Sequence, residues 1–383
     1  MRVGVNLLWL VPGVVGGSEE YTTRLLRAVA RRDPEDCDLT LFVLEPFADA
    51  HPELVEAFDT VTVPLDGHRK PERVAAEATW LAFEAHRRDI DLLHHAGGVV
   101  PPGPAITRTP AVLTIHDLQP LLLPENFSTI KRRWLAVMLP RSARRARLVL
   151  TPSDPASRSV VELLDVPEDR VLTVPHGVEP PPPVPEGRLA EVRDRYRLGE
   201  RVVLYPAITY PHKDHATLVR AFARIAADRP DLTLLLVGGP GPAEAELAAV
   251  IRATGRGDQV RRTGRIPWDD LDALYALATA VAVPSRFEGF GAPALEAMAA
   301  GAPLVAADAT ALPWVVGEAG RLVPPGDVDA WAATLAEVVD DPDEQARLRA
   351  AGRKRASGFD WDRAADALLT AYRRAAEPGE DGP

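Results

Sequence analysis

Residues 280–296 read AVAVPSRFEGFGAPALE, and this stretch decides the fold class of the chain. The apolar run Ala280–Val283 has the length and composition of a buried parallel strand, and Pro293 suits the first turn of a helix. The glycine-rich loop between them presents unpaired backbone N–H groups near Gly291 and Ala292. A strand, such a loop and a helix in this order are typical of one βα unit, with an anion site where the helix begins.

Short apolar runs alternate with amphipathic stretches on both sides of this unit, which is the pattern of parallel strands covered by helices. The first half of the chain predicts strands at Val3–Leu7, Leu39–Leu44, Thr60–Val63, Leu92–His94, Ala111–Ile115, Leu148–Leu150 and Val171–Val174. It predicts helices at Ser18–Arg31 (capped by Ser18), Pro71–Arg88, Ser128–Arg145 and Pro155–Leu164. The second half predicts strands at Arg201–Ile208, Leu232–Gly238, Val260–Thr263, Ala280–Val283, Pro303–Ala306 and Arg321–Val323. Its helices are expected at His215–Ala227, Ala243–Thr254, Trp268–Leu277, Ala294–Ala300, Val328–Asp340, Asp343–Ser357 and Trp361–Ala376.

A proline-rich segment separates the two halves. Residues 179–185 read EPPPPVP, where proline removes backbone donors and stiffens the chain into an extended spacer. We therefore expect an N-terminal domain at 1–179, a linker at 180–200, a second domain at 201–360, and a C-terminal helix and tail at 361–383 that can pack back on the first domain. The predicted fold class is α/β, with two Rossmann-like doubly wound domains facing each other across a cleft. Ligands bind at the carboxyl ends of the strands in such sheets.

The composition excludes several classes of protein. The 383 residues carry 44 Lys and Arg against 55 Asp and Glu, a formal net charge of -11, whereas nucleic-acid binding normally needs a basic face. The single cysteine, Cys37, allows no internal disulfide and favours a reducing compartment. The N-terminus lacks the pattern of a signal peptide, and no apolar stretch is long enough to span a bilayer. We expect a cytoplasmic protein without a nucleic-acid partner.

Two glutamates in the opening stretch are candidates for binding a polar ligand. Glu288 follows the strand and Glu296 lies in the first turns of the helix, with seven residues between them. A carboxylate can accept two hydrogen bonds from a vicinal diol, as the ribose-binding acid of dinucleotide folds does. Taken singly, each glutamate fits a loop charge or an acid near a helix start. The whole string with its glycine spacing, including Gly289-Phe290-Gly291-Ala292, favours a ligand site.

A lysine follows the first strand of the second domain, in Pro211-His212-Lys213-Asp214-His215. The chain contains only four lysines against 40 arginines, and they are Lys70, Lys131, Lys213 and Lys354. A compact ammonium at the carboxyl edge of a sheet can neutralise a diphosphate leaving group, which is the role we assign to Lys213. An ordinary solvated loop lysine is the alternative.

The first domain offers two weaker candidates. Gly16 and Gly17 lie in the loop GVVGGS at 13–18, where they permit close approach of the backbone to a ligand. The loop is not a G-x-G-x-x-G fingerprint, which argues against a dehydrogenase and leaves a plain tight turn as an equal alternative. His116 ends a strand in TIHDL at 114–118, where its imidazole can orient a sugar hydroxyl or serve the structure alone.

Two further features bear on metals and partners. Asp-x-Asp pairs begin at residues 36, 89, 270, 327 and 360, but they are scattered through helix starts and loops, so we expect no metal site. Residues 128–147 form a basic helix with Trp134 and Val137 among its cations, and no acidic residue falls between Glu125 and Asp154. This helix is a candidate for peripheral contact with the inner face of a membrane or with a lipid diphosphate acceptor. A solvated helix packed on its own sheet is the alternative.

Taken together, these strings resemble the family-4 retaining glycosyltransferases of the GT-B fold over nearly the whole chain. The most specific likeness is the pair Glu288 and Glu296 within residues 287–303. Supporting parts are Gly16-Gly17, Ile115-His116-Asp117, VPHGV at 174–178 and PHKDH at 211–215.

The resemblance implies roles for individual residues. Lys213 would bind the donor diphosphate, Glu296 the ribose, and Glu288 would lie near the donor sugar. His116 would lie near the sugar in the cleft, and Gly16-Gly17 near the phosphates. The remaining donor-binding positions would be His212, Gly289, and the backbone N–H groups of Phe290, Gly291 and Ala292. Members of the family usually need no metal.

Three positions depart from the family pattern. Most relatives carry arginine at His212, so compensation of the diphosphate charge would rest on Lys213 or on another arginine. The usual glutamate after Leu-Pro is Trp314 here, which would form a hydrophobic wall, and many relatives have asparagine at His176. The Pro-His-Lys-Asp-His variant resembles a subgroup that often uses GDP-mannose or related donors.

We therefore expect a metal-independent hexosyltransferase of polysaccharide biosynthesis. It would move a hexosyl group from a nucleoside diphosphate sugar, with a GDP-mannose-like donor favoured, to a glycan or lipid-linked acceptor. The nucleotide sugar is a co-substrate, and no other cofactor is implied. Two alternatives stay open: a GT-B nucleotide-sugar epimerase or phosphorylase, and a nucleotide-sugar-binding protein whose catalysis has lapsed.

Overall fold

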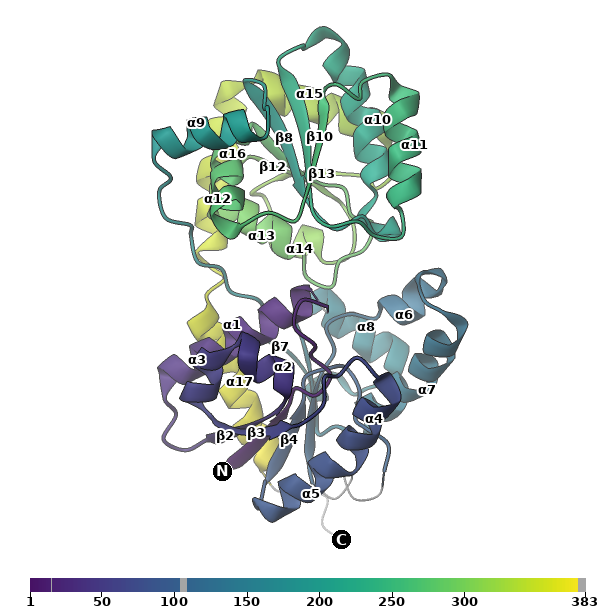
Figure 1. Cartoon of the computed structure of the whole chain (residues 1–383), viewed down its shortest axis with the longest axis vertical. Helices are drawn as coiled ribbons and strands as arrows, with labels where there is room; N and C mark the ends of the chain where they lie inside the picture. Colours follow the sequence, from purple (N-terminus) through teal and green to yellow (C-terminus); the bar gives the residue numbers. More distant parts are fainter. Residues whose placement is uncertain (15, 104–108, 378–383) are drawn as a thin grey trace. The chain divides into compact units, whose positions relative to one another are not determined.

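The computed structural model describes residues 1–14, 16–103 and 109–377. The chain divides into two compact units, each built around one parallel sheet (Figure 1). The first unit comprises Met1–Gly177 and the chain from Asp360 onward, and the second comprises Val178–Phe359.

The segment predicted as a linker at 180–200 is only partly a linker. Glu186–Arg195 forms α9, which packs on α12 (Trp268–Leu277) of the second unit. Val192 of α9 is fully buried in the core of that unit. The linker prediction was therefore wrong beyond Pro185, because the chain after the prolines carries an apolar residue that the second core requires.

The first unit contains a seven-stranded sheet in the order β3-β2-β1-β4-β5-β6-β7. Its strands are β1 (Arg2–Asn6), β2 (Asp38–Leu44), β3 (Asp59–Val63), β4 (Leu92–His95), β5 (Ala111–Thr114), β6 (Leu148–Thr151) and β7 (Val171–Thr173). Its α-helices are α1 (Gly17–Arg32), α2 (Glu45–Ala50), α3 (Pro52–Ala57), α4 (Lys70–Ala78), α5 (Trp80–Arg87), α6 (Gln119–Leu122), α7 (Thr129–Arg145), α8 (Asp154–Leu164) and α17 (Trp361–Ala376). The strand order reverses between β1 and β4, so the topological switch point of this sheet lies there.

Two predicted helices of the first unit differ in detail. The stretch expected as one helix at Pro71–Arg88 is broken into α4 and α5 at Thr79, whose hydroxyl donates to the carbonyl of Ala75 at 2.7 Å. A side chain that bonds back onto the preceding turn bends a helix. Ser18 does not cap α1, because the helix begins one residue earlier and its N-cap is Gly16.

The C-terminal helix α17 belongs to the first unit, although the whole second unit precedes it in sequence. It packs along α1, and Trp361, Leu368 and Tyr372 enter the core that β1, β2 and β4 share. The hydroxyl of Tyr372 lies 2.7 Å from Nδ1 of the buried His94 at the end of β4. The first core is therefore complete only when the chain has returned from the second unit.

The second unit contains a six-stranded sheet in the order β10-β9-β8-β11-β12-β13. Its strands are β8 (Arg201–Pro206), β9 (Leu232–Val237), β10 (Val260–Gly264), β11 (Ala280–Val283), β12 (Leu304–Ala307) and β13 (Arg321–Val323). Besides α9 and α12, its α-helices are α10 (His215–Ile225), α11 (Glu244–Thr254), α13 (Ala292–Ala299), α14 (Leu312–Val316), α15 (Val328–Asp340) and α16 (Pro342–Ala356). The switch point lies between β8 and β11, where ligands bind in doubly wound sheets.

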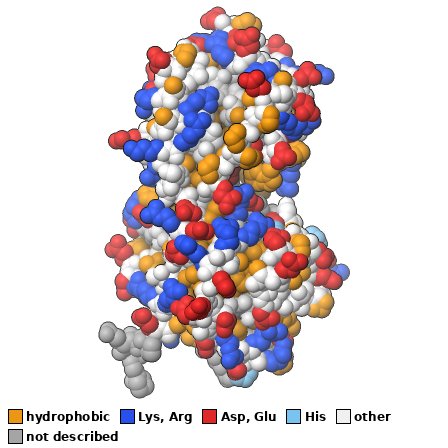
Figure 2. Space-filling model, turned by 90° about the vertical axis from the view of Figure 1, so that its left-hand side faces the viewer, with side chains coloured by type: hydrophobic (Ala, Val, Ile, Leu, Met, Phe, Trp, Pro, Cys, Tyr) orange, Lys and Arg blue, Asp and Glu red, His pale blue; other side chains and the backbone are white. Residues whose placement is uncertain are grey.

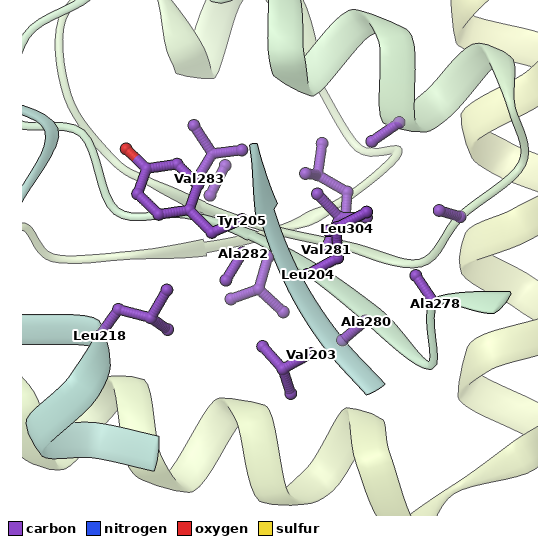
Figure 3. Packing of buried hydrophobic residues seen from close by; sticks show 14 of the residues in the cluster. Val203, Leu204, Tyr205, Leu218, Ala278, Ala280, Val281, Ala282, Val283 and Leu304 are labelled. Atoms are coloured by element: carbon purple, nitrogen blue, oxygen red, sulfur yellow. The ribbon is translucent and has the colours of Figure 1, made fainter. Parts of the chain in front are cut away.

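The two strands at this switch point are buried on both faces. Figure 3 shows Val203, Leu204 and Tyr205 of β8 close to Val281 and Val283 of β11, in the core of the unit. Each of these side chains is 0% exposed, and burying an aliphatic side chain of this size stabilises a fold by about 1.5–3 kcal/mol. The loops that follow β8 and β11 therefore start from fixed positions.

The surface shows no segregation of charge on the face drawn in Figure 2, where acidic and basic side chains are interspersed. Within the described ranges, no helix is both long and apolar enough to cross a membrane.

Candidate active site

An ion pair joins the two loops at the switch point of the second unit. Lys213 ends the short 3-10 helix Pro211–Lys213 that follows β8, and Glu288 lies in the loop between β11 and α13. Nζ of Lys213 donates to Oε1 of Glu288 at 2.6 Å, and the two side chains are only 17% and 10% exposed. The lysine and the glutamate that the sequence singled out separately are thus direct partners. Because little solvent reaches them, the electrostatic attraction between the two charges is only weakly screened.

Backbone and side-chain bonds hold these loops together. The N–H of Arg286 donates to the carbonyl of His212 at 2.8 Å. Nε of Arg286 donates to Oδ2 of Asp214 at 2.7 Å. The same carboxylate caps α10 by accepting from the N–H and the hydroxyl of Thr217. Because two contacts between the loops fix their spacing and the cap of α10 fixes Asp214, the Lys213–Glu288 pair is preorganised.

Tyr205 supports the pair from the core of the second unit. Its ring is buried in the core, and its hydroxyl donates to the carbonyl of Lys213 at 2.8 Å and lies 3.1 Å from Oγ of Ser285. Burial raises the pKa of Tyr205 well above its usual value, and the charge of Glu288 acts in the same direction. The hydroxyl therefore stays protonated and keeps its donor role.

Thr310 is a site residue that the sequence did not reveal. It lies between β12 and α14, and its Oγ1 accepts from the N–H of Glu288 at 2.9 Å. Its φ of 49° is in the left-handed region, which is uncommon for a β-branched residue. A strained residue that holds the backbone of Glu288 indicates a functional constraint at this loop. Nothing in the sequence around Thr310 distinguishes it from an ordinary turn.

The start of α13 has the geometry expected of an anion-binding helix terminus. Gly291 is its N-cap with a φ of 104°, and a Cβ there would lie 2.8 Å from Cδ2 of Leu312. Ala292 begins the helix, so its N–H is among the groups that have no carbonyl partner within the helix. The preceding Gly289 and Phe290 complete the loop, and the ring of Phe290 is 4% exposed.

Trp314, where the resemblance implies a glutamate, packs among aromatic rings. Its ring meets Phe290 at 6.2 Å and 72° and Phe359 at 5.8 Å and 79°, both edge-on. The hydrophobic wall expected for Trp314 is therefore a support behind the loop before α13. The aromatic pairs fix Phe290, and with it the backbone that leads to Gly291.

Glu296 has a different neighbour from Glu288. It lies on α13, where its Oε2 accepts from the hydroxyl of Tyr275 of α12 at 3.0 Å. Burial raises the pKa of Tyr275 well above its usual value, and the charge of Glu296 adds to the effect. The tyrosine therefore orients one carboxylate oxygen, a contact that the sequence did not predict.

His212 contributes no charge at neutral pH. Burial and, to a smaller extent, the charge of Lys213 lower its pKa to about 4, and Glu288 acts in the opposite direction. The ring stacks on Tyr210 at 5.6 Å and 17°, and Tyr210 is itself 41% exposed. With His212 neutral, the positive charges at these loops are Lys213 and the adjacent Arg286.

The switch point of the first unit places Gly16, Gly17 and His116. Gly16 and Gly17 begin α1, and a Cβ at either would meet no atom within 4 Å, so the backbone there is open to a ligand. Glu19 stabilises the loop before them, since its Oε2 accepts from the N–H of Gly13 at 2.8 Å. Val15, which is part of the predicted loop, lies outside the described residues.

His116 follows β5 and is enclosed by aromatic rings. Its Nε2 donates to the carbonyl of Ala96, which follows β4, at 3.0 Å. Tyr21 approaches edge-on at 5.4 Å and Trp9 lies tilted at 5.9 Å. Burial lowers the pKa of His116 to about 4, with the Ala96 contact acting in the opposite direction. The ring is thus a neutral group, and one of its nitrogens is used by the backbone.

His176 extends this aromatic group toward the C-terminal helix. It lies 4.5 Å from Tyr21 and 6.0 Å from Trp361, and burial lowers its pKa to about 3. The hydroxyl of Tyr21 donates to the carbonyl of Val174 at 2.9 Å. His176 therefore packs between the rings of Tyr21 and Trp361.

The Asp-x-Asp pairs have structural partners. Asp327 and Asp360 cap α15 and α17. Asp270 is buried and binds Arg195 at 2.9 Å, with Arg188 and Tyr196 also in contact. These carboxylates cap helices or form salt bridges within the fold.

Comparison with known proteins identifies the family. The protein family described as "Glycosyltransferase Family 4" matches residues 15–180, and the family "Glycosyl transferases group 1" matches residues 191–355. The O-antigen chain mannosyltransferase B of Escherichia coli is 31% identical over 266 residues, which cover 69% of this chain and 70% of that protein. The chain belongs to the family-4 glycosyltransferases. Another member, a D-inositol 3-phosphate glycosyltransferase of Salinispora arenicola, is 31% identical. The similar region covers 94% of this chain and 87% of that protein.

A third relative of this glycosyltransferase, the MMP alpha-(1->4)-mannosyltransferase of Mycolicibacterium hassiacum, is 35% identical over 64% of this chain and 58% of that protein.

Solved structures confirm the GT-B fold. Sucrose-phosphate synthase from Thermosynechococcus elongatus superposes with a TM-score of 0.77 at 21% identity, covering 98% of both chains. Anabaena HepE in complex with UDP and glucose gives 0.75 at 23% identity, covering 98% of this chain and 100% of that one. The Lys213–Glu288 pair lies in the segment that matches the second description.

Proposed function

We propose that this glycosyltransferase moves a hexosyl group from a nucleoside diphosphate sugar to a glycan or lipid-linked acceptor, with retention of the anomeric configuration. A GDP-mannose-like donor is favoured, since two relatives are named as mannosyltransferases. The observation that carries the proposal is the 2.6 Å contact between Lys213 and Glu288 at the switch point of the second sheet. A cation and a hydrogen-bond acceptor meet there, which are the two groups a sugar diphosphate requires.

Donor binding would exchange the partners of this pair. The ammonium of Lys213 would turn to the diphosphate, and the carboxylate of Glu288 would accept from hydroxyls of the donor sugar. N–H groups at the start of α13, near Gly291 and Ala292, would add dipoles directed at negative charge. Glu296, oriented by Tyr275, would bind the ribose diol. Lys213 and Glu288 would thus exchange each other for parts of the donor, so both charges have a partner with and without donor.

The transfer itself would need no covalent nucleophile from the protein. The bond between the anomeric carbon and the diphosphate oxygen breaks, and a bond from the acceptor oxygen forms on the same face. The acceptor proton would pass to a phosphate oxygen of the leaving group, whose charge Lys213 stabilises. His116, neutral and fixed by Ala96, would orient a sugar hydroxyl.

We also propose that transfer requires no added metal ion, which assay in EDTA would test. The buried free thiol of Cys37 supports a reducing, cytoplasmic site of action.

The direct test is a donor screen followed by product analysis. Purified protein would be incubated with GDP-mannose, UDP-glucose and ADP-glucose, and thermal stabilisation and nucleoside diphosphate release would be measured. One donor should raise Tm and release its diphosphate in an acceptor-dependent way, and NMR should show a retained anomeric configuration. Conversion of the donor without acceptor would replace the proposal with epimerisation. Stabilisation without turnover on a panel of glycan and lipid-linked acceptors would leave only binding.

A further inference from the structure

Helix α7 carries an exposed face that the transfer reaction does not use. Ser128 caps the helix by accepting from the N–H of Lys131, so its start is well defined. Ile130 is 84% exposed, Val137 65% and Trp134 40%. Their spacing of four and three residues places them on one side of the helix. The opposite side carries Leu135, Met138, Leu139, Ser142 and Ala143, which are buried.

The same exposed side continues into cations. Arg133 lies among the three apolar residues, and Arg141 and Arg144 extend the face by one and two further turns. All three arginines are exposed. Between Glu125 and Asp154 the sequence contains no acidic residue, although the chain as a whole has a net charge of -11. Local positive charge of this kind on an acidic protein indicates an anionic partner.

We propose that this face of α7, formed by Ile130, Arg133, Trp134, Val137, Arg141 and Arg144, docks on an anionic lipid bilayer. The helix would lie in the plane of the interface, with Ile130, Trp134 and Val137 at the boundary between headgroups and acyl chains. Tryptophan is favoured at that depth, and the arginines would pair with lipid phosphates. Figure 1 shows α7 with α6 and α8 at one side of its unit, away from α1.

A bilayer fits this face better than a protein partner. A two-fold contact with a second copy would bring arginines against arginines, because such an interface pairs the same patch with itself. Three apolar side chains in a row also offer little area for a stable protein interface. A lipid surface needs only shallow insertion supplemented by charge. This inference is independent of the donor, so it can fail while the proposed transfer stands.

The test is co-sedimentation of the full chain with vesicles of phosphatidylcholine alone or with roughly a third of anionic phosphatidylglycerol added. Wild type should bind the anionic vesicles and not the neutral ones. Arg133→Gln/Arg141→Gln/Arg144→Gln should lower the partition coefficient by roughly 100-fold, because each of the three cations contributes about fivefold. Ile130→Ser/Val137→Ser should lower it by about tenfold.

Matched controls come from exposed residues elsewhere. Phe83→Ser removes a side chain of α5 that is 63% exposed, and Arg252→Gln removes an exposed cation of α11. Both should bind like wild type, and every variant should keep its Tm because the changes are on the surface. Equal binding to both vesicle types, or equal binding by wild type and the two α7 variants, would overturn the proposal. So would concentration-dependent dimerisation that the α7 variants abolish, because the face would then serve a second copy.

Discussion

The two sheets share a strand order around their switch points but carry opposite chemistry there. In the second unit the loops after β8 and β11 meet through a lysine, a glutamate and an Asp214–Arg286 pair. In the first unit the corresponding loops after β1 and β4 lie beside His116, which is neutral and surrounded by Tyr21 and Trp9. One switch point is built around an ion pair, and the other around neutral imidazole and aromatic rings.

This difference matches the two halves of a glycosyl transfer. In the proposed transfer a diphosphate would leave as an anion and need a nearby cation, which Lys213 of the second unit would supply. A sugar hydroxyl is neutral and needs orientation, which neutral imidazole and amphipathic rings can give. One architecture can thus bind chemically different partners, because ligands contact the loops and not the sheet.

The largest expected effect comes from removing either partner of the Lys213–Glu288 ion pair. Lys213→Ala and Glu288→Ala should each lower kcat/KM by about 10²–10³-fold, since removing one preorganised group at developing charge has that effect. Steady-state transfer kinetics with the donor identified in the screen would measure it.

The matched control is Lys354→Ala on α16, which removes an exposed lysine from the same unit. It should leave kinetics unchanged. Turnover near the wild-type value in both Lys213→Ala and Glu288→Ala would remove the charged switch point from the mechanism.

The next largest effect is that acid should destabilise the first unit more than the second. Burial lowers the pKa of His94, His95 and His176 to about 3 and that of His116 to about 4, all in the first unit. The second unit has two such groups, His212 and His215, with pKa values of about 4. Because these folded values lie below the unfolded value of about 6.5, the unfolded chain binds more protons, and stability falls as pH drops below 6.5.

At pH 5.5 each such histidine costs roughly 1.4 kcal/mol relative to neutral pH. The two additional histidines should therefore destabilise the first unit by about 2–3 kcal/mol more than the second. Hydrogen exchange at pH 7.0 and 5.5, corrected for intrinsic rates, would report the loss of protection in β4 and β5 against β8 and β11. Equal losses, or a greater loss in the second unit, would contradict this contrast.

A smaller effect distinguishes the two glycine positions. Gly291→Ala combines a φ of 104° with a Cβ placed 2.8 Å from Leu312, so it should lower the free energy of unfolding by about 2–3 kcal/mol. Gly16 has a φ of 66° and a ψ of -128°, a combination that suits glycine, but a Cβ there meets open space. Gly16→Ala should therefore lower the free energy of unfolding by about 1–2 kcal/mol, through backbone strain alone. Urea unfolding of both variants would measure the difference. A larger effect for Gly16→Ala would show that the first loop is the more constrained of the two.

The smallest effect concerns Thr310. Thr310→Ala removes the acceptor of the Glu288 N–H and should lower kcat/KM by about fivefold, equivalent to about 1 kcal/mol. Thr310→Ser keeps the hydroxyl and should restore most of the activity. Equal rates for the alanine and serine variants would mean that the hydroxyl does not position Glu288.

The sequence predicted the parts of the site that strand ends and glycines mark. Lys213 follows one buried strand and Glu288 another, so their meeting at one sheet edge followed from the βα pattern. The ion pair between them did not, because the pattern does not tell which side chains face each other. The order of β8 beside β11 decides that, and it is a property of the whole sheet.

Other contacts had no local signal. Thr310 and Tyr275 reach the site from strand and helix ends that are remote in sequence. The prolines at 180–185 predict a linker and hide helix α9, although Val192 of this helix belongs to the core of the second unit. Such roles depend on tertiary packing, which periodicity cannot express.

The central claim is that Lys213 binds the diphosphate and Glu288 the sugar of one donor. Calorimetric titration of wild type, Lys213→Ala and Glu288→Gln with GDP and with GDP-mannose tests it most directly. Lys213→Ala should lose at least about tenfold in affinity for both ligands, whereas Glu288→Gln should weaken GDP-mannose and leave GDP nearly unchanged. Wild-type affinity of Lys213→Ala for GDP, in a protein whose wild type binds it, would contradict the account.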